Sequence, residues 1–420
     1  MKTPSPPRPS PTAGGQTADI AIVGAGIIGL SCAYELARQS DLRIVVFDKQ
    51  QPATGTTGGS AGVICLHDMG AIYALLTLLG YARIQELRGE HDFGFRPWGT
   101  LLALYGDRPF PLPPDPYTAR FGGQPDSIYE QVALTPTELI RRYPWIRPDP
   151  RLRGGVLYPN QGYLDPTALT LLYERLAVAT GRVTVMRNTP VLQMRRRGAG
   201  IQTLVTRRGP WQVGQVLNAA GPWGAKVAAL AGVELPLTPQ RIQVCVASAF
   251  DDGAEEAPLT PIPEEVKGEG VWCRGEIGNT MLFGQHHHTT KAGFTVDPDY
   301  VNRVNDAEFP GAVEQVVRRY WNLPKTVFLN GWCCVYGTTD DGFPIVSRDA
   351  EVENLYHAVG LNGHGMTCHA GIAQLVAELM LRGRTRLEIT GLTKQPETID
   401  FSVLNAGRFA RGERLTFELH

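Results

Sequence analysis

Residues 19–36, DIAIVGAGIIGLSCAYEL, restrict the fold of this chain more than any other stretch. The segment is almost uncharged, but a membrane span needs about twenty predominantly apolar residues, and glycines interrupt this one. The residues before it are rich in Pro, Ser and Thr, so we expect a disordered tail, residues 1–17, and not a signal peptide. We predict a strand at Ile20–Val23, a turn, and a helix from Ile27. LRIVVFDKQ supplies a second strand that ends at Asp48, which completes a βαβ unit.

The spacing G-x-G-x-x-G in this unit predicts a dinucleotide site. Gly24 would make the tight turn, Gly26 would leave space for a pyrophosphate, and Gly29 would let the helix pack close to the strand. Asp48 follows at the distance where a carboxylate accepts hydrogen bonds from ribose hydroxyls, and it favours an unphosphorylated ribose. The alternative is an ordinary glycine turn between core elements. On these residues alone, NAD and FAD both remain open.

The overall composition excludes several classes of protein. The chain has 420 residues, 43% of them hydrophobic, which is enough for two domains with a sizeable core. Its 40 basic and 41 acidic residues nearly cancel, so we expect no nucleic-acid partner, no membrane-surface partner and no transmembrane segment. We interpret the basic run Arg195–Arg197 as a solvated turn. Seven cysteines without C-x-x-C spacing indicate a reducing, cytoplasmic location, without a disulfide framework or a metal site.

Further strands are predicted far along the chain from this βαβ unit. RVTVMRNTPVLQM (182–194) and WQVGQVLNAAGPWG (211–224) have strand patterns, and the second ends in a Gly-Pro turn. LYHAV (355–359) leads through LNGHGM into a helix whose apolar residues follow helical spacing: Ile372, Leu375, Val376, Leu379 and Met380. We therefore predict one nucleotide-binding sheet assembled from separated stretches. The Pro-rich segments between them would pair into a second, mixed sheet that covers the cofactor.

Four motifs resemble the FAD-dependent D-amino-acid oxidase superfamily, in its branch with glycine oxidase, sarcosine oxidase and dimethylglycine dehydrogenase. They are the glycine motif with Asp48, TGGSAGVI (57–64), LNAAGPWGAKVAALAGVELPLTPQR (217–241), and TTDDGFPIV followed by HAVGLNGHGMTCHAGIAQLVAEL near the C-terminus. The resemblance covers nearly all of the chain after the first residues, and it implies FAD as the cofactor in place of NAD.

The resemblance implies an α/β fold with two domains. One is a Rossmann-like FAD-binding domain of the GR2 type, discontinuous in sequence, and the other is a mixed β-sheet substrate domain. The FAD-binding domain would comprise residues 18–80, 151–239 and 331–420. The substrate domain would comprise residues 81–150 and 240–330.

The family motifs also imply which residues contact FAD. The N–H groups and the positive dipole end of the C-terminal helix would face the flavin where negative charge develops on reduction, a stabilisation of about 0.3–2 kcal/mol. A glycine-rich turn before a core helix is the alternative. The candidate cofactor-binding residues are Gly24, Gly26, Ile27, Ile28, Gly29, Asp48, Lys49, Thr57, Ser60, Ala61, Gly62, Val191, Ala220, Gly221, Trp223, Cys333, Gly363, His364, Gly365, Met366 and Thr367.

In this family a hydride equivalent leaves the carbon beside an amine nitrogen, and water hydrolyses the resulting imine. The resemblance therefore implies an amine, an amino acid or an N-alkyl amino acid as substrate and no metal. MLFGQHH is similar to the sarcosine oxidase stretch that carries an active-site histidine, which puts His286 in that role, with a polar loop or an adventitious metal site as the alternative. The usual carboxylate anchors are absent, because Thr367 and Val335 stand where relatives have lysine and arginine. Arg274 and Arg241 remain as anchors or as structural salt-bridge partners. The candidate catalytic residues are His286, Arg274 and Thr367.

Two positions bear on the electron acceptor and on the flavin linkage. Leu282 stands where monomeric sarcosine oxidase has a lysine over the flavin, so we expect a dehydrogenase or a slow oxidase, with O2 or another electron acceptor. Cys333 lies seven residues before Asp340, as does the flavin-bonded cysteine of that enzyme, so Cys333 is a candidate for covalent attachment of FAD. The alternative is a small buried hydrophobe. Two other classes of protein stay open: a flavin-bearing subunit of a hetero-oligomeric amine dehydrogenase, and an NAD-dependent Rossmann oxidoreductase.

Overall fold

The structure is a computed structural model that describes residues 16–65, 70–106, 120–121, 126–248, 257–266, 269–286, 295–322 and 326–416. For residues 261–266, 269, 285 and 286 this description covers the backbone alone. Most of the predicted tail, 1–17, therefore lies outside it. Residues 16 and 17 do not belong to a tail, because the first strand already begins at Gln16.

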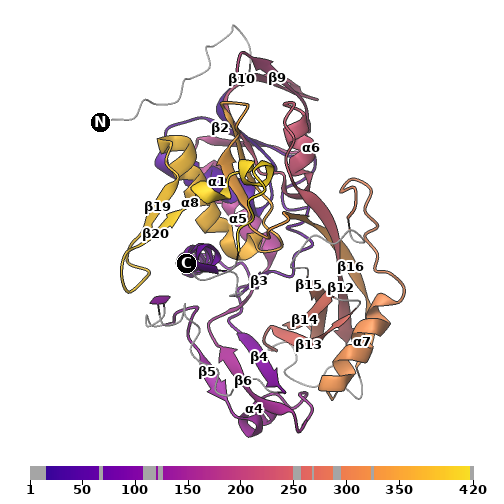
Figure 1. The fold of residues 1–420 in the computed structure, drawn as a ribbon. Coiled ribbons are helices and arrows are strands. Elements are labelled where there is room, and N and C mark those ends of the chain that lie inside the picture. The colour runs from indigo at the N-terminus through magenta and orange to yellow at the C-terminus, as the bar shows by residue number, and fades with distance from the viewer. Residues whose placement is uncertain are drawn as a thin grey trace.

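The largest sheet in the described part of the chain has eight strands and a dinucleotide-binding topology (Figure 1). Its path is β17-β18-β11-β1-β2-β8, and β10 and β9 extend from β11. The pairs along β18-β11-β1-β2-β8 are parallel, whereas β17, β10 and β9 are antiparallel to their neighbours. The strands are β1 (Gln16–Val23), β2 (Ile44–Phe47), β8 (Val183–Met186), β9 (Val191–Arg197), β10 (Gly200–Thr206), β11 (Gly209–Asn218), β17 (Ile345–Arg348) and β18 (Leu355–Val359). The prediction of one sheet built from separated stretches is confirmed.

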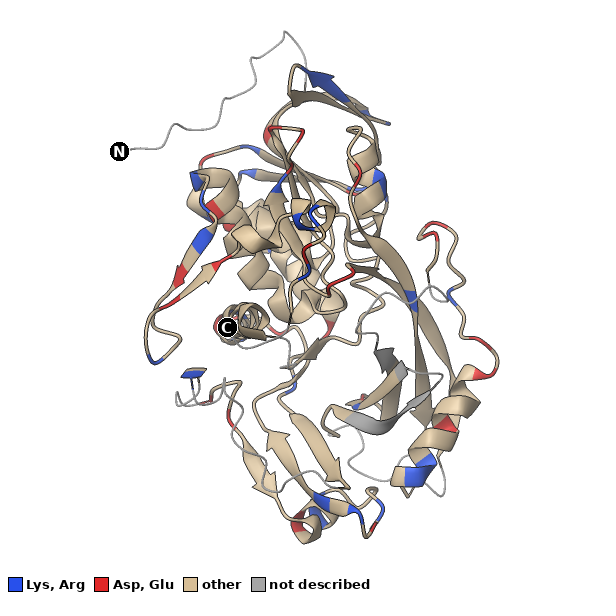
Figure 2. Cartoon of the chain, viewed as in Figure 1, with Lys and Arg blue, Asp and Glu red and all other residues tan. Residues whose placement is uncertain are grey.

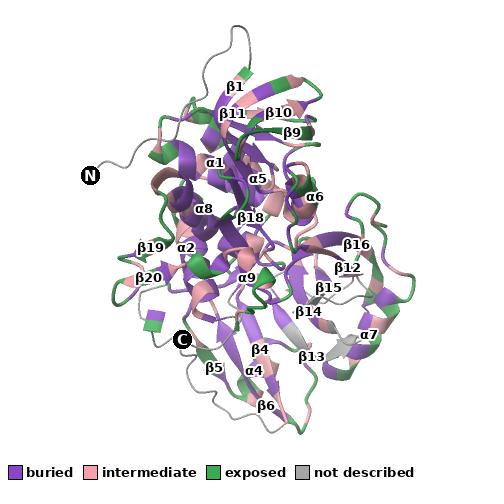
Figure 3. Ribbon diagram, turned by 45° about the horizontal axis from the view of Figure 1, so that its top comes forward, coloured by how far each residue is buried: buried purple, intermediate pink, exposed green. Residues whose placement is uncertain are grey.

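Four helices form the main core on one face of this sheet (Figure 3). They are α1 (Ile27–Gln39), α2 (Gly70–Arg88), α5 (Pro166–Ala179) and α8 (Gly365–Arg382). Three of them pack against its strands and the fourth, α2, packs against α8. Helix α8 buries all five apolar residues of the predicted face. It packs closely against α2, because a Cβ on Gly371 would meet Leu76 at 2.8 Å. None of the described helices combines the length and the hydropathy that a membrane-spanning helix requires.

The opposite face of the sheet is covered by β9, β10, the turn η1 (Gly221–Trp223) and α6 (Gly224–Ala229). The basic run Arg195–Arg197 lies here, and Figure 2 shows it in blue at the end of β9. The interpretation as a turn was wrong: these arginines belong to an exposed edge strand, and the turn follows them. Elsewhere basic and acidic residues are interspersed (Figure 2).

The predicted substrate-domain segments, 81–150 and 240–330, form two smaller sheets, but both sheets cross the predicted bounds: β6 (Leu152–Tyr158) and most of β16 (Val327–Thr338) were assigned to the FAD-binding domain and pair here instead. One has the order β13-β14-β15-β12-β16 and the other β4-β6-β5, and every pair within them is antiparallel. A parallel bridge between Thr100 and Leu259 joins the two, so they form adjoining sheets and not one continuous sheet. Their elements are β4 (Thr100–Tyr105), β5 (Val132–Leu134), α4 (Pro136–Arg142), β6 (Leu152–Tyr158), β12 (Thr238–Ser248), β13 (Thr260–Val266), β14 (Glu269–Glu276), β15 (Thr280–His286), α7 (Phe309–Tyr320) and β16 (Val327–Thr338).

Two short sheets and a C-terminal segment complete the fold. The first pairs β3 (Val63–Ile64) with β7 (Gly162–Tyr163), and the second pairs β19 (Arg386–Ile389) with β20 (Glu397–Asp400). The chain then passes through η4 (Ser402–Leu404) and α9 (Gly407–Ala410). This last segment returns to the large sheet, where it contacts the loop before β17.

Candidate active site

A cavity lies at the carboxyl ends of β1, β2, β11 and β18. Ligands of parallel α/β sheets bind at this edge, because the strands are followed there by turns and helix N-termini. The predicted cofactor-binding residues that line the cavity are Gly24, Gly26, Ile27, Ile28, Asp48, Lys49, Thr57, Ser60, Val191, Ala220, Gly221, Trp223, Gly363, Gly365 and Met366. The structure therefore brings together side chains from all four motifs.

The three glycines of the first motif meet different surroundings. Gly24 has a φ of +112°, and a Cβ there would lie 2.5 Å from the carbonyl oxygen of Ala219. A Cβ on Gly29 would lie 1.9 Å from the carbonyl oxygen of Gly24, so Gly29 is a packing residue, as predicted, and not a wall of the cavity. A Cβ on Gly26 would meet only the Thr57 hydroxyl, at 3.1 Å. The space beside Gly26 is therefore open towards the cavity.

Two helix N-termini face the same cavity. Helix α1 has Gly26 as its N-cap, which has no side chain, and α8 has His364, whose side chain accepts no hydrogen bond from its helix. In α1 the Ile27 amide donates to the hydroxyl of Thr57 at 3.2 Å. Uncapped N-termini present backbone N–H groups and a partial positive charge, which suit anionic or electron-rich groups.

At one end of the cavity, which we call the Asp48 end, charged side chains gather. The Asp48 carboxylate accepts hydrogen bonds from the amides of Ala25 and Gln50, both at 2.8 Å. Beside it lies a group that we call the clasp: Lys49, Trp223, Lys226, Asp297 and Asp299. The clasp joins the large sheet to the segment between β15 and α7.

Asp299 is the centre of the clasp. It accepts hydrogen bonds from Lys49 and Lys226, both at 2.6 Å, and from the Trp223 indole at 2.7 Å. Lys226 also contacts Asp297 at 2.5 Å, and the Lys49 ammonium lies 3.9 Å from the centre of the Trp223 ring. Partial burial alone would raise the pKa of Asp299, but these hydrogen bonds outweigh it and lower the pKa.

At the other end, which we call the Gly363 end, hydrogen bonds fix the turn before α8. Asn362 and Gly363 both have positive φ, +50° and +90°. Asn362 accepts a hydrogen bond from the amide of Thr339 at 2.9 Å and donates to its hydroxyl at 3.2 Å. Thr339 in turn donates to the carbonyl oxygen of Phe343 at 2.7 Å. The turn is therefore fixed to the loop between β16 and β17.

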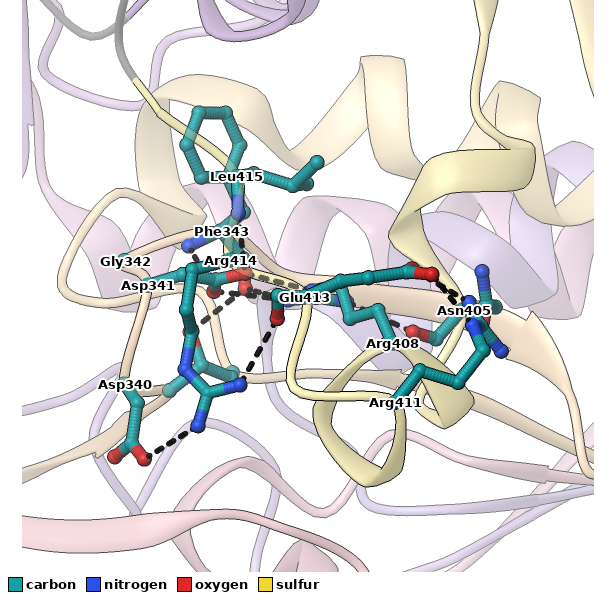
Figure 4. Close-up of polar contacts among 12 residues, drawn as sticks. Asp340, Asp341, Gly342, Phe343, Asn405, Arg408, Arg411, Glu413, Arg414 and Leu415 are labelled. Atoms are coloured by element: carbon teal, nitrogen blue, oxygen red, sulfur yellow. Dashed lines mark hydrogen bonds and ion pairs between the residues drawn. The ribbon is translucent and has the colours of Figure 1, made fainter.

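That loop is anchored by a buried ion pair with the C-terminal segment (Figure 4). Arg408 contacts the two carboxylate oxygens of Asp341 at 2.7 and 3.0 Å and donates to the Phe343 carbonyl at 2.9 Å. The side chains of Arg408 and Asp341 are 1% and 0% exposed. Burial alone would raise the pKa of Asp341, but the guanidinium of Arg408 outweighs it and lowers the pKa.

The predicted catalytic residues are placed differently from one another. Thr367 donates to the Val63 carbonyl at 3.1 Å and is not among the described residues that line the cavity. Arg274 is buried and donates to the carbonyls of Ala61 and Gly275 and to Glu276, so its guanidinium has the structural partners that the sequence left open. Burial lowers the pKa of Arg274. His286 is the last residue of β15, and its side chain lies outside the described residues, as do His287 and His288.

Arg241, the other candidate carboxylate anchor, is also engaged. Its guanidinium contacts Asp306 at 3.0 Å and donates to the carbonyls of Asn302 and Val304. These partners belong to the chain segment that carries the clasp aspartates. Arg241 therefore fastens that segment to β12.

The placement of Cys333 contradicts its predicted contact with FAD. Its sulphur lies 3.2 Å from the carbonyl oxygen of Val304, on the face of β16 that also meets Gln243. Alternate residues of a strand point to opposite faces, so Cys334 takes the cavity side, where it packs against Gly59. Burial raises the pKa of Cys333, and it raises the pKa of Cys334 to about 12.

Three other predicted cofactor residues pack behind the lining. Ala61 accepts the hydrogen bond from Arg274, and a Cβ on Gly62 would lie 1.9 Å from the Leu164 carbonyl. The ring of His364 packs edge-on against Tyr73, with 5.4 Å between ring centres. These residues support the lining and do not belong to it, as far as the structure describes the chain.

Several lining residues were missed by the sequence analysis. Tyr336 and Asn362 lie next to motifs that were recognised, and an Asn before Gly in LNGHGM is itself a signal for positive φ. Strand alternation from Cys333 would have placed Tyr336 on the face opposite to it. Lys226 and Asp299 carry no local signal, because only the tertiary fold brings them together.

The described residues fit a dinucleotide that carries a flavin. Because Gly26 has no side chain, the space beside the α1 N-terminus is open and leaves room for a pyrophosphate. A methyl group at this position would fill it. The Asp48 carboxylate stands where it can meet a ribose, and the N-terminus of a second helix, α8, lines the same cavity. A nicotinamide dinucleotide requires the first two features but not the third.

Comparisons with known proteins agree with this reading. Residues 19–379 match the family model described as DAO, FAD dependent oxidoreductase. Over 401 residues the chain is 23% identical to mitochondrial dimethylglycine dehydrogenase of Rattus norvegicus. The aligned region covers 91% of this chain and 45% of that protein. It is 24% identical to monomeric sarcosine oxidase of Bacillus sp. (strain NS-129), covering 89% of this chain and 95% of that one.

Among solved structures, L-proline dehydrogenase from P. horikoshii has the same fold, with a TM-score of 0.75 and 21% identity over 96% of this chain and 100% of that one. The chain spans less than half the length of the mitochondrial dehydrogenases that it matches. The family model, by contrast, covers most of this chain. The chain therefore belongs to the DAO family of FAD dependent oxidoreductases.

Proposed function

We propose that this chain binds FAD in the cavity and oxidises the C–N bond of an amine, an amino acid or an N-alkyl amino acid to an imine. The observation that carries the proposal is that the N-termini of α1 and α8, neither with a hydrogen bond from its own N-cap side chain, line one cavity together with Asp48. The substrate class rests on the names of the relatives, which oxidise sarcosine and dimethylglycine.

Each part of the cavity has a proposed task. The amides at the start of α1 hold the pyrophosphate and Asp48 holds the ribose, while the N-terminus of α8 favours negative charge beside Gly365 by about 0.3–2 kcal/mol. FAD, when bound, accepts the hydride equivalent that leaves the carbon beside nitrogen. The chain positions that carbon and excludes water.

For the catalytic candidates, the contacts support different proposals. Arg274 is a positioning residue, because its hydrogen bond to Ala61 steadies the loop that carries Thr57 and Ser60. Thr367 holds α8 to β3. His286 is proposed at the substrate, because it ends β15 in the five-stranded sheet. Leu282 in the same strand is buried and uncharged, which supports slow reaction with O2 and another electron acceptor.

The test starts with the colour of the purified chain. A yellow protein whose absorption matches oxidised flavin, and which N-methyl amino acids or proline bleach in the absence of oxygen, supports the proposal. A colourless protein that binds NAD would contradict it. Bleaching without oxygen followed by slow recovery in air, together with fast turnover on an artificial acceptor, would favour a flavin-bearing subunit of a larger dehydrogenase.

A further inference from the structure

One face of the five-stranded sheet is turned towards the cavity. On β16 the Trp332 indole donates to the Gly59 carbonyl at 2.9 Å. Two residues on, the Cβ of Cys334 lies 2.6 Å from where a Cβ on Gly59 would be. After two more residues, the ring of Tyr336 lies 2.6 Å from where a Cβ on Gly363 would be, and Tyr336 lines the cavity. These alternating residues define the cavity side of β16.

Gln240 on β12 lies on the same side. It pairs directly with Tyr336 across the strands, and side chains of directly opposed residues in an antiparallel pair share a face. Gln240 is completely buried, and neither its amide nitrogen nor its amide oxygen has a hydrogen-bond partner among the described residues.

The buried glutamine on the opposite face of β12 has hydrogen-bond partners, so unpaired side chains are not general in this strand. Gln243 is also buried, but its amide nitrogen donates to Asp306 at 3.0 Å and its amide oxygen accepts from the Asp306 backbone at 2.8 Å. Buried carboxamides in folded proteins are normally satisfied in this way. Gln240 is not itself among the described lining residues, but it lies directly beside Tyr336, which is, and an unsatisfied carboxamide at that place points to a group that arrives with the ligand.

We propose that Gln240 and Tyr336 form a hydrogen-bonding site for the flavin ring of FAD, at the Gly363 end of the cavity. This rests on the proposed function. The flavin ring carries carbonyl oxygens and ring nitrogens along one edge, so it matches a carboxamide that donates and accepts. The cavity that Tyr336 lines is the one that holds Gly26 and Asp48, which favours the cofactor over the substrate as partner.

The test compares Gln240→Met, Tyr336→Phe and the control Gln243→Met in the full chain. Methionine keeps the volume of Gln240 without its polar atoms, so the FAD-free protein should melt at the same or a higher temperature. FAD affinity should fall about tenfold to a hundredfold, and the visible spectrum of the bound flavin should shift. Tyr336→Phe keeps the ring against Gly363 and should weaken FAD severalfold. Gln243→Met should lower the melting temperature but leave FAD affinity unchanged.

Three results overturn the inference. FAD affinity could stay at the parent value in both Gln240→Met and Tyr336→Phe. The KM for the amine could rise while FAD affinity and spectrum stay constant, which would assign the pair to the substrate. The FAD-free Gln240→Met protein could be less stable than the parent, with unchanged spectra in Tyr336→Phe, which would make Gln240 structural. If the parent itself binds no FAD, the proposed function fails, and that outcome is distinct from these three.

Discussion

The two ends of the cavity are both held by ion pairs, but in opposite ways. At the Asp48 end the clasp pairs Lys49 and Lys226 with Asp299, and these side chains are 39%, 45% and 37% exposed. At the Gly363 end the supporting pair of Arg408 and Asp341 is almost completely buried. Exposed pairs are screened by salt and add little stability, whereas breaking a buried pair leaves an uncompensated charge. We infer that the Asp48 end can open to admit a dinucleotide while the Gly363 end stays fixed.

The largest effect on folding and on FAD binding is expected at the glycine turn between β1 and α1. Gly29→Ala places a methyl group 1.9 Å from the Gly24 carbonyl, so the chain should not fold. Gly26→Val should leave the fold intact, because a Cβ there meets only the flexible Thr57 hydroxyl, yet abolish FAD binding. Circular dichroism and flavin retention distinguish the two. A folded, yellow Gly26→Val protein would remove Gly26 from the site.

Next in size is Arg408→Met at the Gly363 end. Loss of one partner of a buried pair typically costs about 3–5 kcal/mol of unfolding free energy, and Asp341 would keep its charge without the guanidinium. The matched control is Arg411→Met in the same segment, whose pair with Glu413 is 53% and 55% exposed (Figure 4). Chemical unfolding should separate the two variants clearly. Equal stabilities would show that the Gly363 end does not depend on the buried pair.

The features of the fold and the site that depend on local sequence patterns could be predicted, whereas the ion pairs at the two ends of the cavity could not. The glycine motif, the α8 face and the strand endings follow local patterns, so the large sheet and most of the lining were predictable. Asp299 lies 73 positions after Lys226 and Arg408 lies 67 after Asp341, and no local pattern encodes such pairs. The error at Cys333 has a similar origin: a motif match gives the residue number, but only the strand register shows which face it takes.

Acid should act first at the Gly363 end, through His369. Its ring nitrogens contact the carbonyl of Met366 and the hydroxyl of Tyr173, both at 2.8 Å, and burial lowers its pKa to about 4. The unfolded chain, with an ordinary pKa of about 6.5, binds more protons below that pH. Stability that is full above about pH 6.5 is therefore lost as the pH falls towards about 4, by about 2 kcal/mol at pH 5.

His369→Gln should flatten this dependence in unfolding titrations between neutral pH and pH 5. The clasp should not respond over the same range, because the pKa values of Asp297 and Asp299 are both lowered and their carboxylates stay ionised. An equally steep loss of stability in His369→Gln would assign the acid response to another group.

A smaller effect is expected from Asp299→Asn at the Asp48 end. The variant removes the negative charge that Lys49 and Lys226 share and one of the two oxygens that accept the hydrogen bonds of the clasp, so FAD should leave severalfold faster at low salt. At high salt the parent should match the variant, because screening weakens the exposed pairs. Arg386→Gln is the control, since it breaks an exposed pair with Asp400 in the β19–β20 sheet. Parent and Asp299→Asn release rates with the same salt dependence would show that the clasp does not hold the cofactor.

The smallest effect is expected from Cys333→Ala, at the back of the strand that borders the Gly363 end. The Cys333 sulphur faces Val304 and Gln243, away from the cavity, and burial raises its pKa, so the thiolate that attachment requires is disfavoured. Cys334 faces the cavity side, but burial raises its pKa to about 12. After acid precipitation of the parent and of Cys333→Ala, the FAD should therefore be in the supernatant of both. A yellow pellet from the parent that turns white in the variant would mean that β16 shifts by one residue when FAD binds, and that the Gly363 end is less rigid than its buried ion pair indicates.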